Sequence, residues 1–201
     1  MTEPAERPNL SVIIPTLDEA PHIDAVLADV LQGERLEVIV VDGGSRDATL
    51  ERAARYGVRT CRAAAGRAHQ MNRGAALARG TLFFFLHADS RLPAGFDGVI
   101  RRVLSDRRVA AGAFSLGIEA GTRSMRMVAR GANLRSRILG LPYGDQGIFL
   151  RASRFKRCRG FPDLPIMEDF VLMRRLAKTG AIVTVPECIM TSPRRWRRQG
   201  V

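Results

Sequence analysis

Three short apolar segments that end close to acidic residues constrain the fold of this chain more than any other feature. They are residues 82–86 before Asp89, residues 38–41 before Asp42, and residues 12–14 shortly before Glu19. Apolar runs of this length, bounded by glycine and polar residues, are typical of buried strands. Ligands of open α/β sheets bind in the crevice outside the carboxyl ends of such strands. We therefore predict one metal and phosphate site where the three acidic strand ends meet.

Helical periodicity fills the gaps between these segments. One buried helix face ending at Gly33 is predicted by the spacing of Ile23, Val26, Leu27, Val30 and Leu31. We also expect helices over residues 47–56, 67–79, 93–107 and 167–179, a basic helix within 121–139, a turn and strand over 144–150, and strands over residues 10–14, 36–41, 58–61, 81–86, 110–118 and 181–185. Strands that alternate with helices of about three turns predict right-handed crossovers and a mainly parallel mixed sheet of the α/β class, flanked by helices.

The length and composition indicate one domain without disulfides. A chain of 201 residues can bury a full core. Its net charge of +12, almost wholly from scattered arginines, implies attraction to polyanions without specifying which one. Three widely spaced cysteines favour reduced thiols in the cytosol. Because we find neither a signal peptide nor an apolar run of roughly 20 residues, we expect a soluble chain or peripheral attachment to a membrane.

Two common nucleotide-binding motifs do not occur in the sequence. The loop from Pro15 to Glu19 has no GxGxxG, which disfavours a nicotinamide enzyme, and no GxxxxGK[ST] is present. Asp18 and Glu19 can be explained as acids in the first turn of a helix, where the dipole stabilises them. Asp42, followed by two glycines, can accept hydrogen bonds from a base or a ribose, whereas Asp47 equally suits a helix N-cap.

Asp89 is the candidate metal ligand. Mg²⁺ or Mn²⁺ bound to a diphosphate needs only one or two protein carboxylates, because phosphate oxygens and water fill the other positions. His87 would share a strand face with Asp89, although a neutral histidine at a strand end is more often a packing or hydrogen-bonding residue.

Two pairs of polar residues in the second half are candidates for substrate contacts. GDQG, residues 144–147, places Asp145 and Gln146 between glycines, either to form a turn or to recognise sugar hydroxyls. Glu168 and Asp169 begin the predicted helix over 167–179, where the helix dipole stabilises acids whatever else they do.

Six motifs in order resemble those of the family 2 glycosyltransferases of GT-A fold, from about residue 10 to residue 186. They are PTLDE, VVDGGSRDAT, GRAHQMNRGAALARG, LFFFLHADS, GDQGIF and IMEDF. The chain is most similar to a small bacterial subgroup with HAD in place of DxD. The resemblance implies an inverting, metal-dependent enzyme of hexosyltransferase type, using Mg²⁺ or Mn²⁺. It would move a sugar from a nucleotide-diphosphate sugar to a hydroxyl of a sugar, lipid or small-molecule acceptor.

The resemblance also implies a role for each matching residue. Asp169 of the ED pair would be the catalytic base, and Asp89 would bind the metal. The donor nucleotide would contact Pro15, Thr16, Glu19, Asp42, Arg67 and Asn72. The donor sugar or the acceptor would contact Asp145, Gln146 and Glu168. Residues 10–90 would form the nucleotide-binding half and residues 91–186 the acceptor-binding half of one domain, followed by a basic tail at 187–201.

The chain departs from the family pattern at two places. His87 replaces the first Asp of DxD, and the tail SPRRWRRQGV has no downstream His and no QxxRW order. These departures argue against a metal contact from the tail and against the role of a processive polymerase. Trp196 and its neighbouring arginines could instead cover the donor diphosphate or rest on anionic lipid.

Two other functions remain as alternatives. A sugar-phosphate nucleotidyltransferase has a related fold but usually needs a glycine-rich, basic phosphate loop, for which PTLDE is a poor substitute. A polyanion-binding or membrane-surface module would explain the net charge of +12. Against it, the basic residues are not interleaved with aromatics, so we expect no nucleic acid partner. We expect a cytoplasmic enzyme, or one peripheral to the inner face of the membrane.

Overall fold

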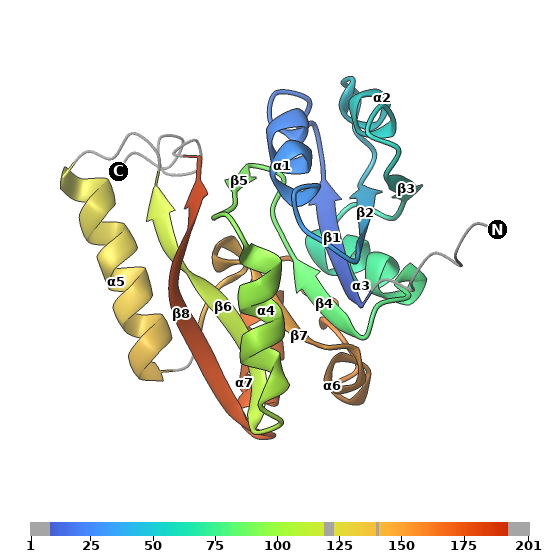
Figure 1. Cartoon of the computed structure of the whole chain (residues 1–201). Coiled ribbons are helices and arrows are strands. Elements are labelled where there is room, and N and C mark those ends of the chain that lie inside the picture. The colour runs from blue at the N-terminus through green and yellow to red at the C-terminus, as the bar shows by residue number, and fades with distance from the viewer. Residues whose placement is uncertain (1–8, 119–122, 140, 193–201) are drawn as a thin grey trace.

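A computed structural model describes residues 9–118, 123–139 and 141–192. Its strands are β1 (Leu10–Thr16), β2 (Leu36–Asp42), β3 (Arg59–Arg62), β4 (Leu82–Phe85), β5 (Ser90–Arg91), β6 (Val109–Ile118), β7 (Ile148–Arg151) and β8 (Ala181–Thr191). Its helices are α1 (Ile23–Val30), α2 (Thr49–Ala54), α3 (Arg67–Leu77), α4 (Phe96–Ser105), α5 (Arg123–Leu139), α6 (Ala152–Arg157) and α7 (Glu168–Ala177), with a 3₁₀ turn, η1, at Gly144–Gln146. Figure 1 shows how they are arranged.

The strands form one mixed sheet in the order β3-β2-β1-β4-β7-β6-β8-β5. Strands β3, β2, β1 and β4 are parallel to one another, while β7 is antiparallel to both β4 and β6. Strand β8 is parallel to β6, and β5 is antiparallel to β8. The α/β class with a mixed central sheet is thus confirmed. From β1 the chain moves to β2 and β3 on one side, and then crosses to β4 on the other side of β1. This reversal is a topological switch point.

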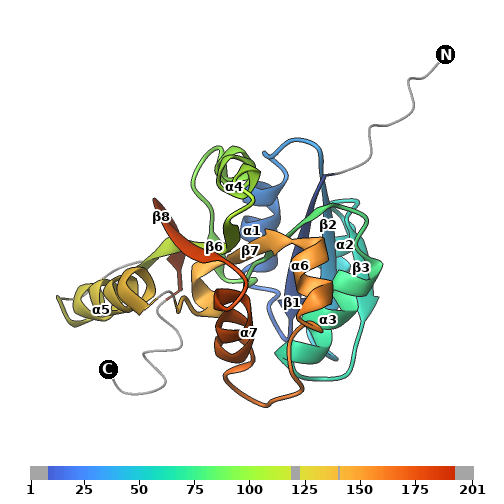
Figure 2. The same cartoon turned by 90° about the horizontal axis from the view of Figure 1, so that it is seen from below.

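Alternating side chains of the central strands supply two cores, one on each face of the sheet. In β1, Leu10, Val12 and Ile14 pack with α1 and α4, whereas Ile13 packs with α3 and α7 on the opposite face. Phe84 and its neighbour Phe85 divide between the faces in the same way. Figure 2 shows α1 and α4 on one side of the sheet and α3 and α7 on the other. Burial on both faces explains why these strands are almost continuously apolar.

Two strands run past a proline and beyond the ends that were predicted for them, residue 14 for the first strand and residue 185 for the last. Strand β1 continues through Pro15 to Thr16, since Pro15 pairs with Val41 of β2 while the pairing with β4 stops at Ile13. Strand β8 does not end at residue 185 but runs to Thr191. A register shift opposite the Ala113–Ser115 stretch of β6 absorbs Pro186, so the ladder resumes beyond it.

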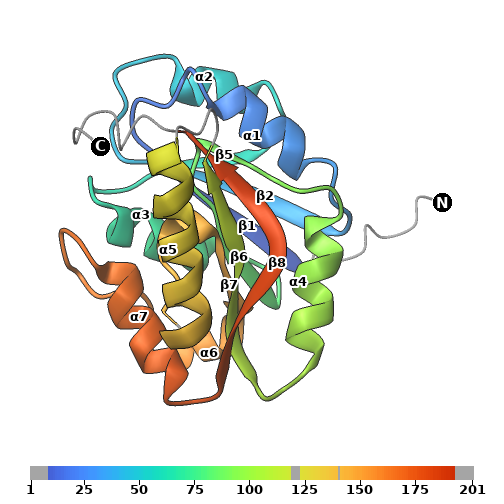
Figure 3. The ribbon, with the colours of Figure 1, turned by 90° about the vertical axis from the view of Figure 1, so that its left-hand side faces the viewer.

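Several element boundaries also differ from the predictions. Two short elements, β5 and α6, were not expected, because neither has enough residues to show a periodic pattern. Helix α2 begins at Thr49, and its N-cap is Ala48 rather than Asp47. Helix α5 confirms the expected basic helix and packs along β6 and β8 (Figure 3). Among the described residues, no helix is long and apolar enough to cross a membrane.

Candidate active site

A pocket of about 310 Å³ opens at the carboxyl ends of β1 and β4, at the topological switch point. Its walls come from the loop after β1, the start of α3 and the turn after β4. The lining residues are Pro15, Thr16, Leu17, Glu19, Gly66, Arg67, Gln70, His87, Ala88 and Asp89. Five predicted site residues are therefore brought together here: Pro15, Thr16, Glu19, Arg67 and Asp89.

The loop after β1 is held by the turn between β2 and α2. The backbone N–H of Asp18 donates to Ser45 Oγ at 2.9 Å, and that of Glu19 donates to Thr49 Oγ1 at 2.8 Å. Asp47 Oδ2 accepts from the N–H of Ala20 at 3.0 Å. A hydrogen bond from Thr49 is the main reason that the pKa of Asp47 is lowered. These bonds give VVDGGSRDAT a scaffolding role for the pocket wall.

Asp42 is fully buried and does not line the pocket. Its Oδ2 accepts from the N–H groups of Gly44 and Ser45, each at 3.0 Å. Gly44 has a φ of +102°, a conformation that glycine adopts readily. The carboxylate thus closes its own turn, and its contact with a nucleotide stays a prediction.

Gln70 is a pocket residue that the sequence reasoning missed. Its side chain is 3% exposed, and Nε2 donates to Thr16 O at 2.7 Å and to Val41 O at 2.9 Å. One amide therefore joins the ends of β1 and β2 at the pocket floor. The available signal was its position three residues after Arg67, which places both on one face of α3.

Asn72 lies on α3 but does not line the pocket. Its Nδ2 donates to Phe161 O at 2.8 Å, and its Oδ1 accepts from Phe161 N at 3.0 Å. Both functions of the amide are used to hold the segment that leads to α7. A direct contact of Asn72 with the donor nucleotide stays a prediction.

His87 and Asp89 lie in a turn and not on a strand. Strand β4 ends at Phe85, so the prediction that the two side chains share a strand face is wrong. The N–H of Ser90 donates to His87 O at 3.2 Å, which closes the turn, and both His87 and Asp89 still line the pocket. The pairing of β4 with β1 ends at the same point, with Phe85 opposite Ile13.

Asp89 fits a divalent metal that a diphosphate would share. The described residues contain no group of three or more His, Cys, Asp or Glu side chains arranged to hold a metal by themselves. A single carboxylate at the mouth of a pocket suits Mg²⁺ or Mn²⁺ whose remaining ligands are phosphate oxygens and water.

Asp169 lies at the start of α7 and faces the turn η1. Its Oδ2 accepts from Gly144 N at 2.7 Å and its Oδ1 from Phe170 N at 2.7 Å, and the residue is 8% exposed. A Cβ atom added to Gly144 would stand 3.3 Å from Asp169 Oδ2 and 3.0 Å from His87 Nε2. The absence of a side chain at Gly144 thus lets the ED pair and the HAD turn approach the same point.

Glu168 connects α7 to the pocket. Its side chain is 2% exposed, and Oε1 lies 2.9 Å from Nε of Arg67, which lines the pocket. Its Oε2 is buried and has no hydrogen-bond partner among the described residues. Glu168, Asp169 and His87 also line a small void of about 10 Å³. A buried oxygen without a donor is costly, so a ligand or water that supplies one would be stabilised here.

Asp145 and Gln146 do not reach the 310 Å³ pocket. Gln146 is fully buried, where Nε2 donates to Phe114 O at 3.1 Å and Oε1 accepts from Tyr143 N at 3.2 Å. Its bonds fix η1 and with it Gly144. Asp145 is half-buried in the same turn. Contacts of these two residues with the donor sugar or the acceptor stay predictions.

The predicted basic tail lies outside the described residues from residue 193 onward, including Trp196. The pairing of Ser90 with Thr191 brings the end of β8 alongside the HAD turn.

The sheet order and the pocket at the switch point define a class, the open α/β proteins whose ligand site lies at the carboxyl ends of parallel strands. Within that class the family is established. The model of glycosyl transferase family 2 matches residues 11–159, and the chain belongs to this family. Its HAD subgroup stays a prediction. No curated protein sequence matches the chain significantly.

Solved structures of glycosyltransferases have the same GT-A fold. A mannosyltransferase from Pyrobaculum calidifontis, in complex with GDP-Man and Mn²⁺, is 21% identical with a TM-score of 0.71; the match covers 92% of this chain and 56% of that one. TarS from S. aureus, in complex with UDP, is 19% identical with a TM-score of 0.74, covering 94% of this chain and 62% of that one.

A third similar structure is glucosyl-3-phosphoglycerate synthase from Mycobacterium tuberculosis, in complex with Mn²⁺, UDP and glucosyl-3-phosphoglycerate. It is 21% identical with a TM-score of 0.71, and the match covers 98% of this chain and 76% of that one. The chain thus spans little more than half of the mannosyltransferase and about three quarters of the synthase.

Proposed function

We propose that the chain transfers a sugar from a nucleotide-diphosphate sugar to an acceptor hydroxyl, with inversion at the anomeric carbon and with a divalent metal. One observation carries the proposal. Gly144 borders both Asp169 and His87, and His87 lines the pocket; this geometry supports Asp169 as a base that acts beside a bound diphosphate. Membership of glycosyl transferase family 2 supports the reaction class.

In the proposed reaction, Asp169 removes the proton of the acceptor hydroxyl while that oxygen attacks the anomeric carbon from the face opposite the diphosphate. The bond between the anomeric carbon and the diphosphate oxygen breaks, its electron pair stays on the diphosphate, and the proton ends on the Asp169 carboxylate. The transition state resembles an oxocarbenium ion. The hydrogen bonds from Gly144 N and Phe170 N orient the carboxylate for this step.

Charge on the departing diphosphate needs stabilisation, and two residues are suited to supply it. Arg67 lines the pocket, and its Nε is held 2.9 Å from Glu168 Oε1. Asp89 would hold Mg²⁺ or Mn²⁺, which when bound supplies Lewis-acid stabilisation of the diphosphate. The similar mannosyltransferase and synthase structures both contain Mn²⁺, in support of this choice.

The pocket wall and the buried Glu168 oxygen suggest how the rest of the donor is bound. Pro15, Thr16 and Glu19 would contact the nucleotide from the loop after β1. Glu168 Oε2, which has no donor within the described part of the chain, would accept a hydrogen bond from a sugar hydroxyl. Residues 10–90 would then bind the nucleotide, and residues 91–186 would supply the acceptor side.

The proposed location is cytoplasmic. Cys61, Cys158 and Cys188 are all free thiols and half-buried, as is typical of a reducing compartment. Burial raises the pKa of the Cys61 and Cys188 thiols, which keeps them protonated and unreactive.

The variant Asp169→Asn tests the proposed base. We expect it to bind the donor nucleotide as the wild type does but to lose transfer by about 10²-fold or more, because the amide cannot take the proton. Donor binding would be measured by calorimetry with UDP, GDP and their sugars in the presence of Mn²⁺, and transfer by release of the nucleoside diphosphate. Unchanged turnover would remove Asp169 from the role. Pyrophosphate release from a nucleoside triphosphate would instead favour the nucleotidyltransferase alternative.

A further inference from the structure

Helix α5 exposes two large apolar side chains among those that the structure describes. Of its described side chains, Ala129 and Ser136 are buried, and Asn133 makes two hydrogen bonds with the backbone of Leu116. Met127 and Leu134, in contrast, face outward and are 71% and 61% exposed. These two side chains therefore belong to a face of α5 that does not pack on the sheet.

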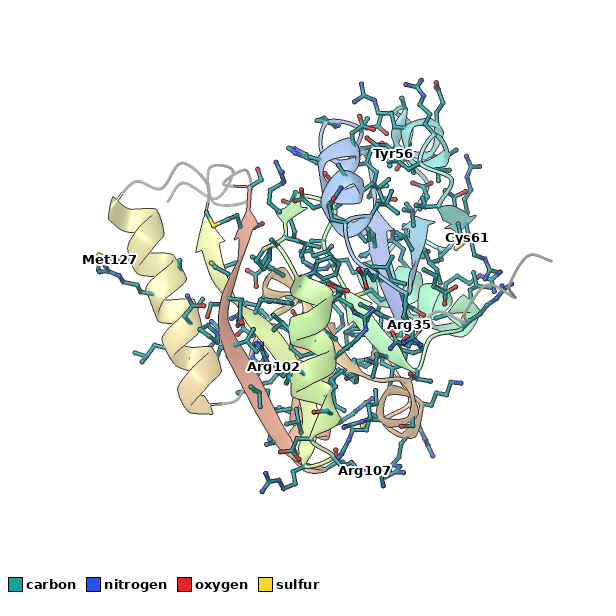
Figure 4. All side chains as sticks on the ribbon, in the orientation of Figure 1. Arg35, Tyr56, Cys61, Arg102, Arg107 and Met127 are labelled. Carbon is teal, nitrogen blue, oxygen red and sulfur yellow. The ribbon has the colours of Figure 1, made fainter. Side chains whose placement is uncertain are left out.

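The exposed residues of α5 form one stripe. Met127, Arg130, Gly131 and Leu134 are all exposed and have the i, i+3, i+4, i+7 spacing of a single helix face. We call these four residues the α5 outer stripe. Figure 4 shows Met127 pointing away from the body of the molecule, and Figure 3 shows α5 standing in front of β6 and β8. Among the described residues, the stripe is therefore an exposed face of a helix about 25 Å long.

The charge of α5 indicates what covers this stripe. Its sequence, RSMRMVARGANLRSRIL, contains five arginines and no Asp or Glu. The stripe combines apolar side chains with an arginine, on a helix that carries only positive charge. These are the properties of helices that lie in the interface of an anionic bilayer. A second copy of the chain fits less well, because the same arginines would face each other.

We infer that the α5 outer stripe docks on an anionic lipid bilayer. Met127 and Leu134 enter the boundary between headgroups and acyl chains, and Arg130 pairs with lipid phosphate. Because both kinds of contact are needed, binding depends on anionic lipid and weakens with added salt.

The docking surface is connected to the candidate active site. The guanidinium of Arg135 on α5 lies 3.7 Å from the centre of the Tyr143 ring, next to Gly144, which donates to Asp169. This connection places the bilayer on the acceptor side and favours an acceptor carried by a lipid. That part of the inference rests on the proposed function. The binding test below does not use transferase activity, so its failure is separate from failure of the proposed function.

The test is cosedimentation of the full chain with vesicles of equal parts phosphatidylglycerol and phosphatidylcholine, and with vesicles of phosphatidylcholine alone. We expect binding only to the anionic vesicles. The double variant Met127→Ser with Leu134→Ser should bind at least about tenfold more weakly because two apolar anchors are lost. Arg130→Glu should bind about tenfold more weakly because the local charge changes by two units.

The matched control is Leu31→Ser, which removes an apolar side chain that is 42% exposed but follows α1, away from α5. It should bind anionic vesicles as the wild type does.

Undiminished binding of the Met127 and Leu134 double variant would overturn the inference and point to the basic tail. Equal loss in Leu31→Ser would overturn it as well. A third result would also overturn it: light scattering shows that the double variant changes from dimer to monomer while its vesicle binding stays the same. That result would assign the stripe to contact with a second copy of the chain. Circular dichroism and thermal melting would verify that each variant is folded.

Discussion

Arg67 and Glu168 form a pair whose two members have very different access to water. The Arg67 side chain is 36% exposed, whereas that of Glu168 is 2% exposed. Water can solvate the guanidinium alone, but it cannot solvate the carboxylate alone. Removing Arg67 should therefore lower the free energy of unfolding by a different amount than removing the charge of Glu168.

We expect Arg67→Ala to lower the free energy of unfolding by about 2 kcal/mol, because a buried carboxylate is left without its cation, an effect moderated by the partial exposure of the pair. Glu168→Gln should cost only about 1 kcal/mol, since the amide oxygen still accepts from Arg67. Urea denaturation would measure both.

The double variant Arg67→Ala with Glu168→Gln provides the check, because it has no buried charge. It should be more stable than Arg67→Ala alone. If the decrease in the free energy of unfolding in the double variant equals the sum of the decreases in the two single variants, Arg67 and Glu168 do not interact as described.

Gly144 lies so close to two candidate site residues that a side chain there would contact both. Its Cβ in Gly144→Ala would stand 3.0 Å from His87 Nε2 and 3.3 Å from Asp169 Oδ2. We expect transfer to fall by about tenfold or more, because one of these groups must move from its position at the site. The free energy of unfolding should change by no more than about 1 kcal/mol, since both neighbours border a small void.

Gly98→Ala is the control for Gly144→Ala. Gly98 lies in α4, and a Cβ there would meet nothing within 4 Å. Alanine should stabilise the helix by about 0.5 to 1 kcal/mol without affecting transfer. A similar loss of transfer in both variants would show that the effect of Gly144→Ala is not local.

At the scale of elements, one buried carboxylate ties α4 to the segment after α1. Asp97 Oδ2 accepts from Glu34 N at 3.1 Å and pairs with Arg101 Nη1, one helical turn along α4. Burial raises the pKa of Asp97, but the hydrogen bonds from Arg101 and Glu34 N outweigh that effect and hold it below the ordinary value of 3.8. Ionised Asp97 therefore contributes to stability.

The sign of the pH dependence follows from the lowered pKa. The contribution of Asp97 is fully present above the ordinary pKa of 3.8 and is lost as the pH falls through the lower pKa of the folded state. Asp97→Asn should thus cost about 1 to 2 kcal/mol at neutral pH and progressively less below about pH 4. Urea denaturation at several pH values would measure this.

Glu51→Gln serves as the control for Asp97→Asn. Glu51 is 70% exposed and pairs with Arg55 on the surface of α2. Its loss should change stability by less than about 0.5 kcal/mol at any pH. A cost of Asp97→Asn that does not depend on pH would contradict the role given to its charge.

At the scale of the whole molecule, the pocket is lined by segments from across the first half of the chain. A ligand that binds the folded state stabilises it by mass action, by about 2.7 kcal/mol at 100 times its dissociation constant. If Asp89 holds a metal shared with a diphosphate, UDP or GDP should raise the melting temperature more with Mn²⁺ than without it.

Removing the metal with EDTA should abolish the additional shift, and so should Asp89→Asn. The shift is measured in each protein against the same protein without nucleotide, so a change in the melting temperature of the free variant does not affect the comparison. A nucleotide-dependent shift that is insensitive to both Mn²⁺ and EDTA would contradict a shared metal site.

Much of the fold could be predicted because its signals are local. The apolar runs at 38–41 and 82–86 did form β2 and β4, and the spacing of Ile23, Val26 and Leu27 did form α1. Boundaries at Pro15 and Pro186 could not be predicted, since a proline is tolerated where the partner strand ends or bulges. That information lies in the neighbouring strand and not in the residues around the proline.

The sequence by itself determined the α/β class, the family and the grouping of Thr16, Arg67 and Asp89 at strand and helix ends, because short-range patterns and motif order specify these. Only the tertiary structure decided which side chains serve the site and which serve the scaffold. Asp42 closes its own turn, Gln70 ties two strand ends together, and Glu168 holds Arg67. These contacts, apart from the turn of Asp42, join segments far apart in the chain. Their partners are set by how the helices pack on the sheet, which no local pattern encodes.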